Sequence, residues 1–272
     1  MANVGRVVRM ELGGGAAWLK WYGRDRRVLR MRAMDAVAVR LGVLPLRAPP
    51  RHAGVERRDL EQRRLSELAS IDVNVPAVLA RGGDCLLLSD LGGTLSERLR
   101  RDPPEAGRAL SALAVAAVAQ VHARGGYLGS PVARNLTVDA AGRIGFIDFE
   151  EDPGEVMPRT QAQARDWLVF AAGLARHAPL DEDELGQLLA IALDGEGGGV
   201  RRELDLAVRR LSFLGQASAW FGARAGGVGK ALGGLRRALG CAVWAPLLLL
   251  ATLDLALDGE LELLAALAGL ID

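Results

Sequence analysis

Lysine is nearly absent from this sequence. Lys20 and Lys230 are the only two lysines among its 34 basic residues, so arginine is the usual cation of the chain. The two side chains are not interchangeable at a phosphate site, because lysine presents a compact point charge and arginine a planar fork. Lys20 lies in a strand-like apolar run, 16–22, that follows the glycines 13–15. We therefore expect Lys20 to have a role for which arginine is unsuited.

Cysteine is also scarce, and the charges of the chain almost cancel. Cys85 and Cys241 stand in apolar surroundings without the spacing of metal ligands, which predicts reduced thiols in the core. The net charge is +1 at pH 7, and no basic run is interleaved with aromatic residues, so we expect no nucleic-acid partner. With 272 residues, 50% of them hydrophobic, the chain is long enough for one two-lobed fold with a sizeable core.

Apolar runs are too short to predict a membrane span. The uncharged stretch 238–253 contains 16 residues, fewer than the roughly 20 that a span needs, so we expect a buried helix there. The preceding segment, 201–237, is rich in arginine and is either a basic surface for anionic lipid or an ordinary solvated helix pair. The N-terminus lacks the apolar core of a secretory signal. We expect a cytoplasmic protein, with peripheral contact at the inner membrane left open.

Chemistry-bearing residues gather in the stretch 134–150. Two short apolar runs on either side of Asp139–Gly142 are typical of strands joined by a turn. Asn135 precedes the first run and Asp148 ends the second, so a hairpin would bring an amide and a carboxylate to facing ends. Magnesium is usually held by one or two side-chain oxygens together with phosphate oxygens. The pattern therefore favours a magnesium site, although an ordinary hairpin would explain it as well.

The stretch Asn135–Glu150, N-L-T-V-D-A-A-G-R-I-G-F-I-D-F-E, resembles the metal-binding hairpin of the protein-kinase-like superfamily. It is similar in particular to the bacterial lipopolysaccharide (Kdo) kinase and aminoglycoside phosphotransferase branches. This resemblance implies an α+β, two-lobed fold. A small N-lobe, 1–91, would contain an antiparallel sheet with one helix, and a larger, mostly helical C-lobe would span 92–272. ATP and magnesium would be the cofactors, with Asn135 and Asp148 as the metal ligands.

The same resemblance assigns roles at a nucleotide site to three further residues. Lys20 would contact the phosphates and pair with Glu61, which lies in the helical pattern 60–68. Leu88 would begin the hinge 88–91, whose backbone would meet the adenine ring. For Glu61 alone, a surface position on a solvated helix is an open alternative.

Two other segments each have two interpretations, and a third is expected to form a helix. The glycines 13–15 form either a shortened phosphate cover or, as we favour, a hairpin turn. The segment 162–170 resembles the helix whose aspartate, here Asp166, braces the catalytic loop, but it also fits an amphipathic helix with an exposed aspartate. An amphipathic helix is expected at 31–41, before prolines interrupt the chain.

The catalytic loop departs from the family pattern. The family places an aspartate five residues before the asparagine, where this chain has Ser130, and a histidine where it has Leu128. A serine cannot accept the acceptor's proton at neutral pH, and losing one general base typically costs about 10²–10⁴ in rate. Phosphoryl transfer depends mainly on positioning and electrostatics, so activity need not be lost. Arg134 is a candidate for neutralising transition-state charge, and the acidic residues 150–152 are candidates for a displaced base.

Three functions remain open at the level of sequence. The first is an atypical phosphotransferase that uses ATP and magnesium to phosphorylate a hydroxyl of a small-molecule, sugar or lipid-linked acceptor, such as a lipopolysaccharide precursor. The second is a pseudokinase that binds nucleotide weakly or not at all and regulates or scaffolds a protein partner. The third is nucleotidyl transfer on the same fold, for which the absence of an aspartate at Ser130 is less damaging.

Overall fold

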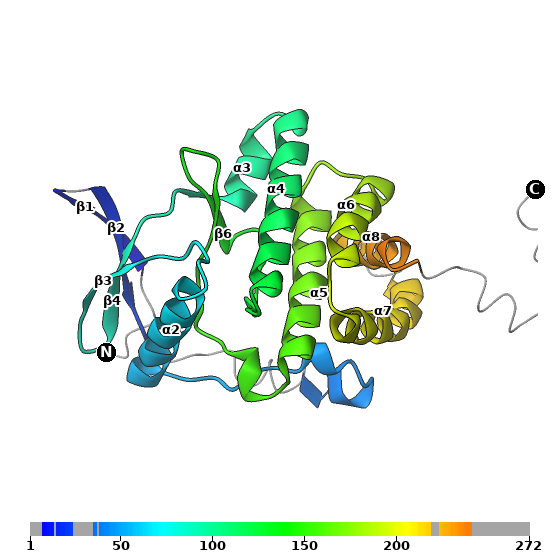
Figure 1. Ribbon diagram of the computed structural model, residues 1–272, viewed down its shortest axis with the longest axis horizontal. Helices are drawn as coiled ribbons and strands as arrows, with labels where there is room; N and C mark the ends of the chain where they lie inside the picture. The colour runs from blue at the N-terminus through cyan, green and yellow to red at the C-terminus, as the bar shows by residue number, and fades with distance from the viewer. Residues whose placement is uncertain (1–6, 14, 24–34, 37, 219–222, 241–272) are drawn as a thin grey trace, which may run out of the picture. The chain divides into compact units, whose positions relative to one another are not determined.

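The computed structural model describes residues 7–13, 15–23, 35–36, 38–218 and 223–240 (Figure 1). The chain divides into two compact units, Met1–Leu239 and Gly240–Asp272. Some predictions from the sequence fall wholly or largely outside the described residues: the first part of the helix at 31–41, Cys241 and the apolar run 238–253.

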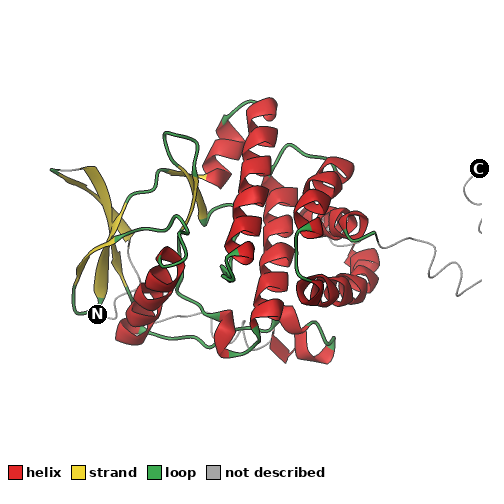
Figure 2. Cartoon of the chain, viewed as in Figure 1, coloured by secondary structure: helices red, strands yellow, loops and turns green. Residues whose placement is uncertain are grey.

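An antiparallel sheet of four strands, in the order β1-β2-β4-β3, forms the N-terminal part of the fold (Figure 2). Its strands are β1 (Val7–Leu12), β2 (Gly15–Trp21), β3 (Val78–Arg81) and β4 (Cys85–Ser89). Leu12 pairs with Gly15, which confirms the hairpin turn expected at the glycines 13–15. Lys20 pairs with Val7 at the opposite end of this hairpin and with Leu86 on β4. The glycine turn is therefore far along the strands from Lys20.

One helix, α2 (Gly54–Ala69), accompanies this sheet and contacts β4. Its apolar stripe of Leu60, Leu65 and Leu68 is buried, and Glu61 is buried beside it. The helix begins six residues before the predicted pattern at 60–68, because its first turns are polar and show no apolar periodicity.

A second sheet, in the order β5-β6-β7, contains the predicted hairpin. Its strands are β5 (Gly93–Thr94), β6 (Leu136–Val138) and β7 (Ile144–Phe146), with Leu136 paired to Phe146. Asn135 precedes β6 directly, and its carbonyl accepts a hydrogen bond from the Ile147 amide at 2.9 Å. Asp148 follows two residues after β7, so both residues lie at the same end of the hairpin, as the sequence predicted.

The rest of the described chain is mostly helical. Its helices are α3 (Leu95–Arg101), α4 (Pro104–Ala123), α5 (Arg159–His177), α6 (Glu182–Asp194), α7 (Gly198–Ser218) and α8 (Ala223–Ala238). Capping boxes at Thr94 and Asp181 satisfy the first amides of α3 and α6. The predicted α+β class, with an antiparallel sheet followed by a mostly helical part, is confirmed (Figure 2).

The core of the helical part forms around α4 and α5. Trp167, Phe170 and Leu174 of α5 are completely buried and pack with the inner face of α4. Of the helices that the structure describes, α4 alone is long and apolar enough to cross a membrane, and only one side of it lies in the core.

The segment between β2 and α2 also packs on the helical part. Its short 3-10 turn η1 (Leu44–Leu46) contacts α5 and α7. The buried guanidinium of Arg165 on α5 donates to the carbonyls of Pro45 and Arg47 at 3.3 and 3.0 Å. A segment that the sequence marks only by its prolines thus joins the region of the first sheet to the helices.

Candidate functional site

A cavity of about 560 Å³ lies between residues of the first sheet, α2 and the β6–β7 hairpin. Its lining includes every residue predicted to bind nucleotide or metal: Lys20, Glu61, Leu88, Asn135 and Asp148. Arg134 also lines this cavity, whereas Ser130 is not part of its lining. Lys20 and Asp148, which are 128 positions apart in the sequence, therefore line the same cavity.

Lys20 is surrounded by carboxylates. Its Nζ lies 2.8 Å from Glu61 Oε2, 2.8 Å from Asp148 Oδ1 and 2.8 Å from Glu150 Oε1. Only 9% of Lys20 and 1% of Glu61 is exposed, so the contact between these two side chains is poorly screened by solvent. The predicted Lys20–Glu61 pair is formed, and the alternative of a surface Glu61 is wrong.

The orientation of Glu61 is fixed by two further donors. The Tyr22 hydroxyl donates to Glu61 Oε2 at 2.7 Å, and the Phe149 amide donates to Glu61 Oε1 at 3.3 Å. Burial, together with the charge of Glu61, raises the pKa of Tyr22 far above its usual value, so the hydroxyl keeps its proton. Each oxygen of Glu61 thus has a second partner besides Lys20.

The charges of Lys20 and Asp148 stabilise each other. The Lys20 ammonium, with smaller contributions from Arg57 and Arg134, holds the pKa of Asp148 below its usual range, although partial desolvation in the cavity opposes this shift. Burial lowers the pKa of Lys20, but Asp148 and Glu61 outweigh it and leave that pKa above its usual value. Asp148 has a φ of 71°, a left-handed conformation that is uncommon outside glycine. The turn exposes 44% of its side chain, and Asp148 lines the cavity.

Asn135 presents an oxygen to the same space. Its Nδ2 donates to the Ser130 carbonyl at 3.0 Å, which leaves Oδ1 as the atom suited to a cation. An amide oxygen and a carboxylate oxygen are the hard ligands that magnesium prefers, and two protein ligands suffice when phosphate and water complete the octahedron. The donor set therefore fits magnesium. Among the described residues, His, Cys, Asp and Glu side chains form no group of three or more that could hold a metal without such additions.

Part of the cavity lining is apolar. Val7, Trp18, Leu88, Leu91 and Ile147 all contribute to it. Leu88 is buried, and residues 88–92, which include the predicted hinge 88–91, all line the cavity. A lining that combines apolar and charged side chains suits a ligand with a flat aromatic ring and an anionic tail.

Asp166 on α5 is hydrogen-bonded to the loop that precedes Asn135. Its carboxylate accepts hydrogen bonds from the amides of Leu128 and Gly129 at 2.5 and 2.6 Å. Asp166 is fully buried, so the predicted brace is confirmed and the exposed alternative is wrong. The side chain of Arg165 adds a bond to the Gly129 carbonyl at 2.9 Å.

A buried histidine supports this brace in turn. His122 Nε2 lies 3.1 Å from Asp166 Oδ2, and Nδ1 lies 2.6 Å from Glu196 Oε1. Burial alone would lower the pKa of His122, but the two hydrogen-bonded carboxylates outweigh it and raise the pKa to about 9. Trp167 Nε1 completes the network by donating to Glu196 at 2.8 Å.

No family model and no curated protein matches this chain.

The three acidic residues considered as displaced bases are placed very differently. Glu150 lines the cavity, bonded to Lys20 and to Arg57. Glu151 pairs with Arg51 at 2.7 Å and does not line the cavity. Asp152 is buried in a separate network with Arg63 and Tyr127. Only Glu150 is therefore in position to act inside the cavity.

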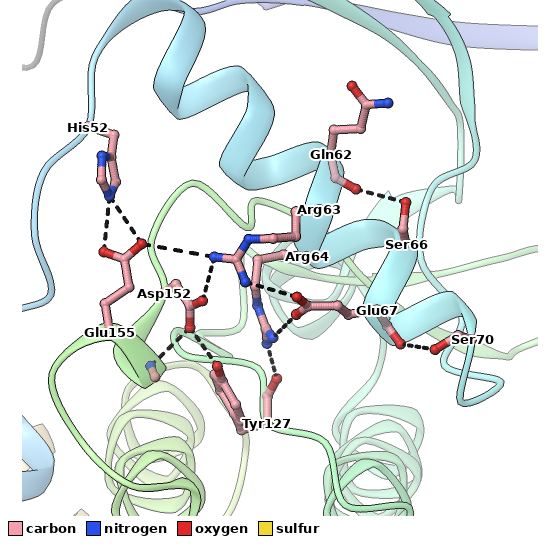
Figure 3. Close-up of polar contacts among 11 residues, drawn as sticks. His52, Gln62, Arg63, Arg64, Ser66, Glu67, Ser70, Tyr127, Asp152 and Glu155 are labelled. Atoms are coloured by element: carbon pink, nitrogen blue, oxygen red, sulfur yellow. Dashed lines mark hydrogen bonds and ion pairs between the residues drawn. The ribbon is translucent and has the colours of Figure 1, made fainter.

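The outer face of α2 is fastened to the segment that follows Asp148 (Figure 3). Asp152 accepts hydrogen bonds from Arg63 at 2.8 Å, from the Tyr127 hydroxyl at 2.6 Å and from the Gly154 amide at 2.9 Å. Arg64 donates to the Tyr127 carbonyl at 2.7 Å and stacks over its ring. These residues, which we call the α2 latch, hold the helix that carries Glu61.

Sequence reasoning missed Tyr22 and Arg57. Tyr22 lies two residues after Lys20, on the same face of the strand, and this spacing could have suggested a shared partner. Arg57 lies four residues before Glu61, one helical turn away, so the same face of α2 could have been searched for a second charged residue. Neither spacing alone predicts which group the side chain meets.

Proposed function

We propose that this protein is a kinase-like phosphotransferase that binds ATP in the cavity and transfers the γ-phosphoryl group to a hydroxyl of a small-molecule, sugar or lipid-linked acceptor. One observation carries the proposal. Lys20 on a strand lies 2.8 Å from Glu61 on a helix and 2.8 Å from Asp148 at the end of a hairpin, within a cavity whose lining is partly apolar. The resemblance of the hairpin at Asn135–Glu150 to the protein-kinase-like superfamily assigns the same residues to this role.

Different residues of the cavity would contact different parts of the ATP molecule. The adenine ring would lie against apolar lining residues such as Leu88, while Lys20 neutralises phosphate charge and Glu61 keeps Lys20 in place. Asn135 and Asp148 would hold magnesium, which neutralises charge on the phosphates when bound. Arg134 is exposed in the cavity lining, near enough to lower the pKa of Asp148, and is suited to stabilise charge on the transferring group.

The chemical step needs no covalent intermediate. The acceptor oxygen bonds to the γ-phosphorus while the bond to the β–γ bridging oxygen breaks, and ADP leaves. The acceptor's proton passes to solvent or to Glu150, because Ser130 has no basic group and does not line the cavity. The absence of a carboxylate at Ser130 predicts slow turnover, while the positioning and electrostatic contributions remain.

A pseudokinase is the second candidate, and a specific observation favours it. The cationic groups Lys20 and Arg57 are both paired with the protein's own carboxylates, so the site is electrostatically satisfied without a ligand. In that case the protein would act through a protein partner, with nucleotide binding weak or absent.

Titration calorimetry of ATP into the purified protein, with and without magnesium, tests the proposal. We expect magnesium-dependent binding that weakens at least tenfold in Lys20→Ala and in Asp148→Ala. Arg101→Ala, which removes a charge at the exposed end of α3, is the matched control and should bind like the wild type. Binding would justify a phosphate-transfer screen that begins with lipopolysaccharide precursors. If ATP does not bind, the phosphotransferase is excluded and the pseudokinase remains.

A further inference from the structure

Two cations of the cavity share one internal carboxylate. Glu150 Oε1 lies 2.8 Å from Lys20 Nζ, and the other oxygen, Oε2, bonds Arg57 Nη2. The side chains of Lys20, Arg57 and Glu150 are all largely buried, and all three line the cavity. A carboxylate with one oxygen on each of two cations occupies the position in which a phosphate group would make the same two contacts.

We propose that Arg57 is a phosphate-binding residue of this cavity. Without a ligand, the carboxylate of Glu150 occupies the position between Lys20 and Arg57, and a bound phosphate group displaces it. This inference deepens the proposed function by naming the second cation for the phosphates. It is nevertheless testable without adenine or an acceptor.

The position of the glycines supports a role for Arg57. In the described part of the chain, the glycines at 13 and 15 lie at the far end of the β1–β2 hairpin from Lys20 and do not line the cavity. The backbone amides of Gly13 and Gly15 therefore do not lie beside Lys20. A guanidinium provides several donors in a fixed plane and binds phosphate well, so Arg57 can supply phosphate contacts that these two amides do not.

Arg57 lies on α2, the helix that also carries Glu61. It lies one turn before Glu61, so the helix that orients Lys20 also carries the second cation. The charge of Arg57 contributes to lowering the pKa of Asp148, which places it within electrostatic range of the predicted metal ligand as well.

The probe for the test is inorganic tripolyphosphate, titrated into the protein in the presence of EDTA. We expect Arg57→Ala to weaken binding about tenfold, and Glu150→Gln, which neutralises the competing carboxylate, to tighten it about fivefold. Arg101→Ala and Glu105→Gln remove matched charges from exposed helix positions and should stay within about twofold of the wild type. Circular dichroism of each variant confirms that it is folded.

The double variant Arg57→Ala/Glu150→Gln separates binding by Arg57 from mere positioning of Glu150. If Arg57 contacts phosphate, its loss weakens binding about tenfold in the Glu150→Gln background too. If Arg57 only holds Glu150, its loss has no effect there, and the inference is overturned. Failure of both the wild type and Glu150→Gln to bind tripolyphosphate overturns it as well.

The outcomes also distinguish this inference from the proposed function. Magnesium-ATP binding that depends on Lys20 but not on Arg57 overturns the inference and leaves the phosphotransferase standing. Tripolyphosphate binding through Arg57, with no binding of ATP, supports the inference and overturns the phosphotransferase.

Discussion

At the scale of single residues, Lys20 is defined by its three carboxylate neighbours. Its Nζ lies 2.8 Å from oxygens of Glu61, Asp148 and Glu150. A guanidinium is broader and cannot bring one nitrogen to the same distance from all three. We expect Lys20→Arg to keep the charge but lose at least tenfold in affinity for magnesium-ATP, measured by calorimetry. The matched control is Lys230→Arg. It changes the second lysine of the chain, which lies on α8, and should bind magnesium-ATP like the wild type.

A second residue-scale prediction concerns Tyr22, whose hydroxyl donates to the buried Glu61 at 2.7 Å. Tyr22→Phe removes one donor from a buried carboxylate, so we expect the free energy of unfolding to fall by about 2 kcal/mol in urea titrations. The control is Ser66→Ala, which removes a hydroxyl from the exposed face of α2 and should cost less than about 0.5 kcal/mol. Equal losses in the two variants would contradict the role assigned to Tyr22.

At the scale of elements, the α2 latch controls where Glu61 lies. Asp152→Asn removes the charge that Arg63 pairs with and replaces the oxygen that accepts from Arg63 with an NH2 donor, while the remaining oxygen can still accept from the Tyr127 hydroxyl. Burial raises the pKa of Asp152, but the hydrogen bonds from Tyr127 and Arg63 outweigh it and hold that pKa below its usual range. We expect the variant to lose about 2 kcal/mol of stability, and hydrogen exchange of the α2 amides to increase.

A surface ion pair provides the control for the latch. Arg101→Ala breaks a pair with Asp102 in which the arginine side chain is 75% exposed, and such pairs contribute about 0–1 kcal/mol. Its α2 amides should exchange as in the wild type. If Asp152→Asn loosens no amide of α2, the latch is not what holds this helix.

The elements themselves differ in how far the sequence predicts them. The β6–β7 hairpin is local, because a turn signal and two apolar runs lie within about fifteen residues, so Asn135 and Asp148 could be paired from the pattern alone. The Lys20–Glu61 pair spans 41 positions and required the family resemblance, since nothing in either segment specifies the other. Whether the whole fold is kinase-like stays a prediction.

Other contacts could not be read from the sequence at all. Arg57 and Glu150 meet across 93 positions, and each lies in a polar run that fits a solvated surface equally well. The packing of η1 (Leu44–Leu46) on α5 depends on carbonyls of an irregular segment that accept from Arg165. Backbone acceptors carry no residue-type signal, so such contacts appear only when the chain is folded.

At the scale of the whole molecule, one buried network joins several distant segments. His122 lies in the last turn of α4, Asp166 and Trp167 belong to α5, and Glu196 lies in the turn after α6. Through Asp166 the same network reaches the loop at 128–129 below the cavity. Its protonation state should therefore affect the stability of the fold as a unit.

We expect this network to make stability depend on pH. The folded-state pKa of His122 is raised to about 9, above the unfolded value of about 6.5. The stabilisation that protonated His122 contributes to the folded state is therefore complete below pH 6.5, declines as the pH rises, and is lost above pH 9. The shift corresponds to about 3 kcal/mol in the free energy of unfolding. Urea titrations at pH 6, 7.5 and 9 would measure it.

His122→Gln isolates this effect from the other groups that titrate in the same range. The pKa of His177 is lowered by burial and by neighbouring arginines, so its contribution has the opposite sign and rises with pH. Because His177 is present in both proteins, the difference in stability between wild type and His122→Gln cancels its contribution. That difference should be largest at pH 6 and should shrink by about 3 kcal/mol by pH 9. A difference that stays constant over this range would mean that His122 is neutral between Asp166 and Glu196, and that the network is held by hydrogen bonds without a buried positive charge.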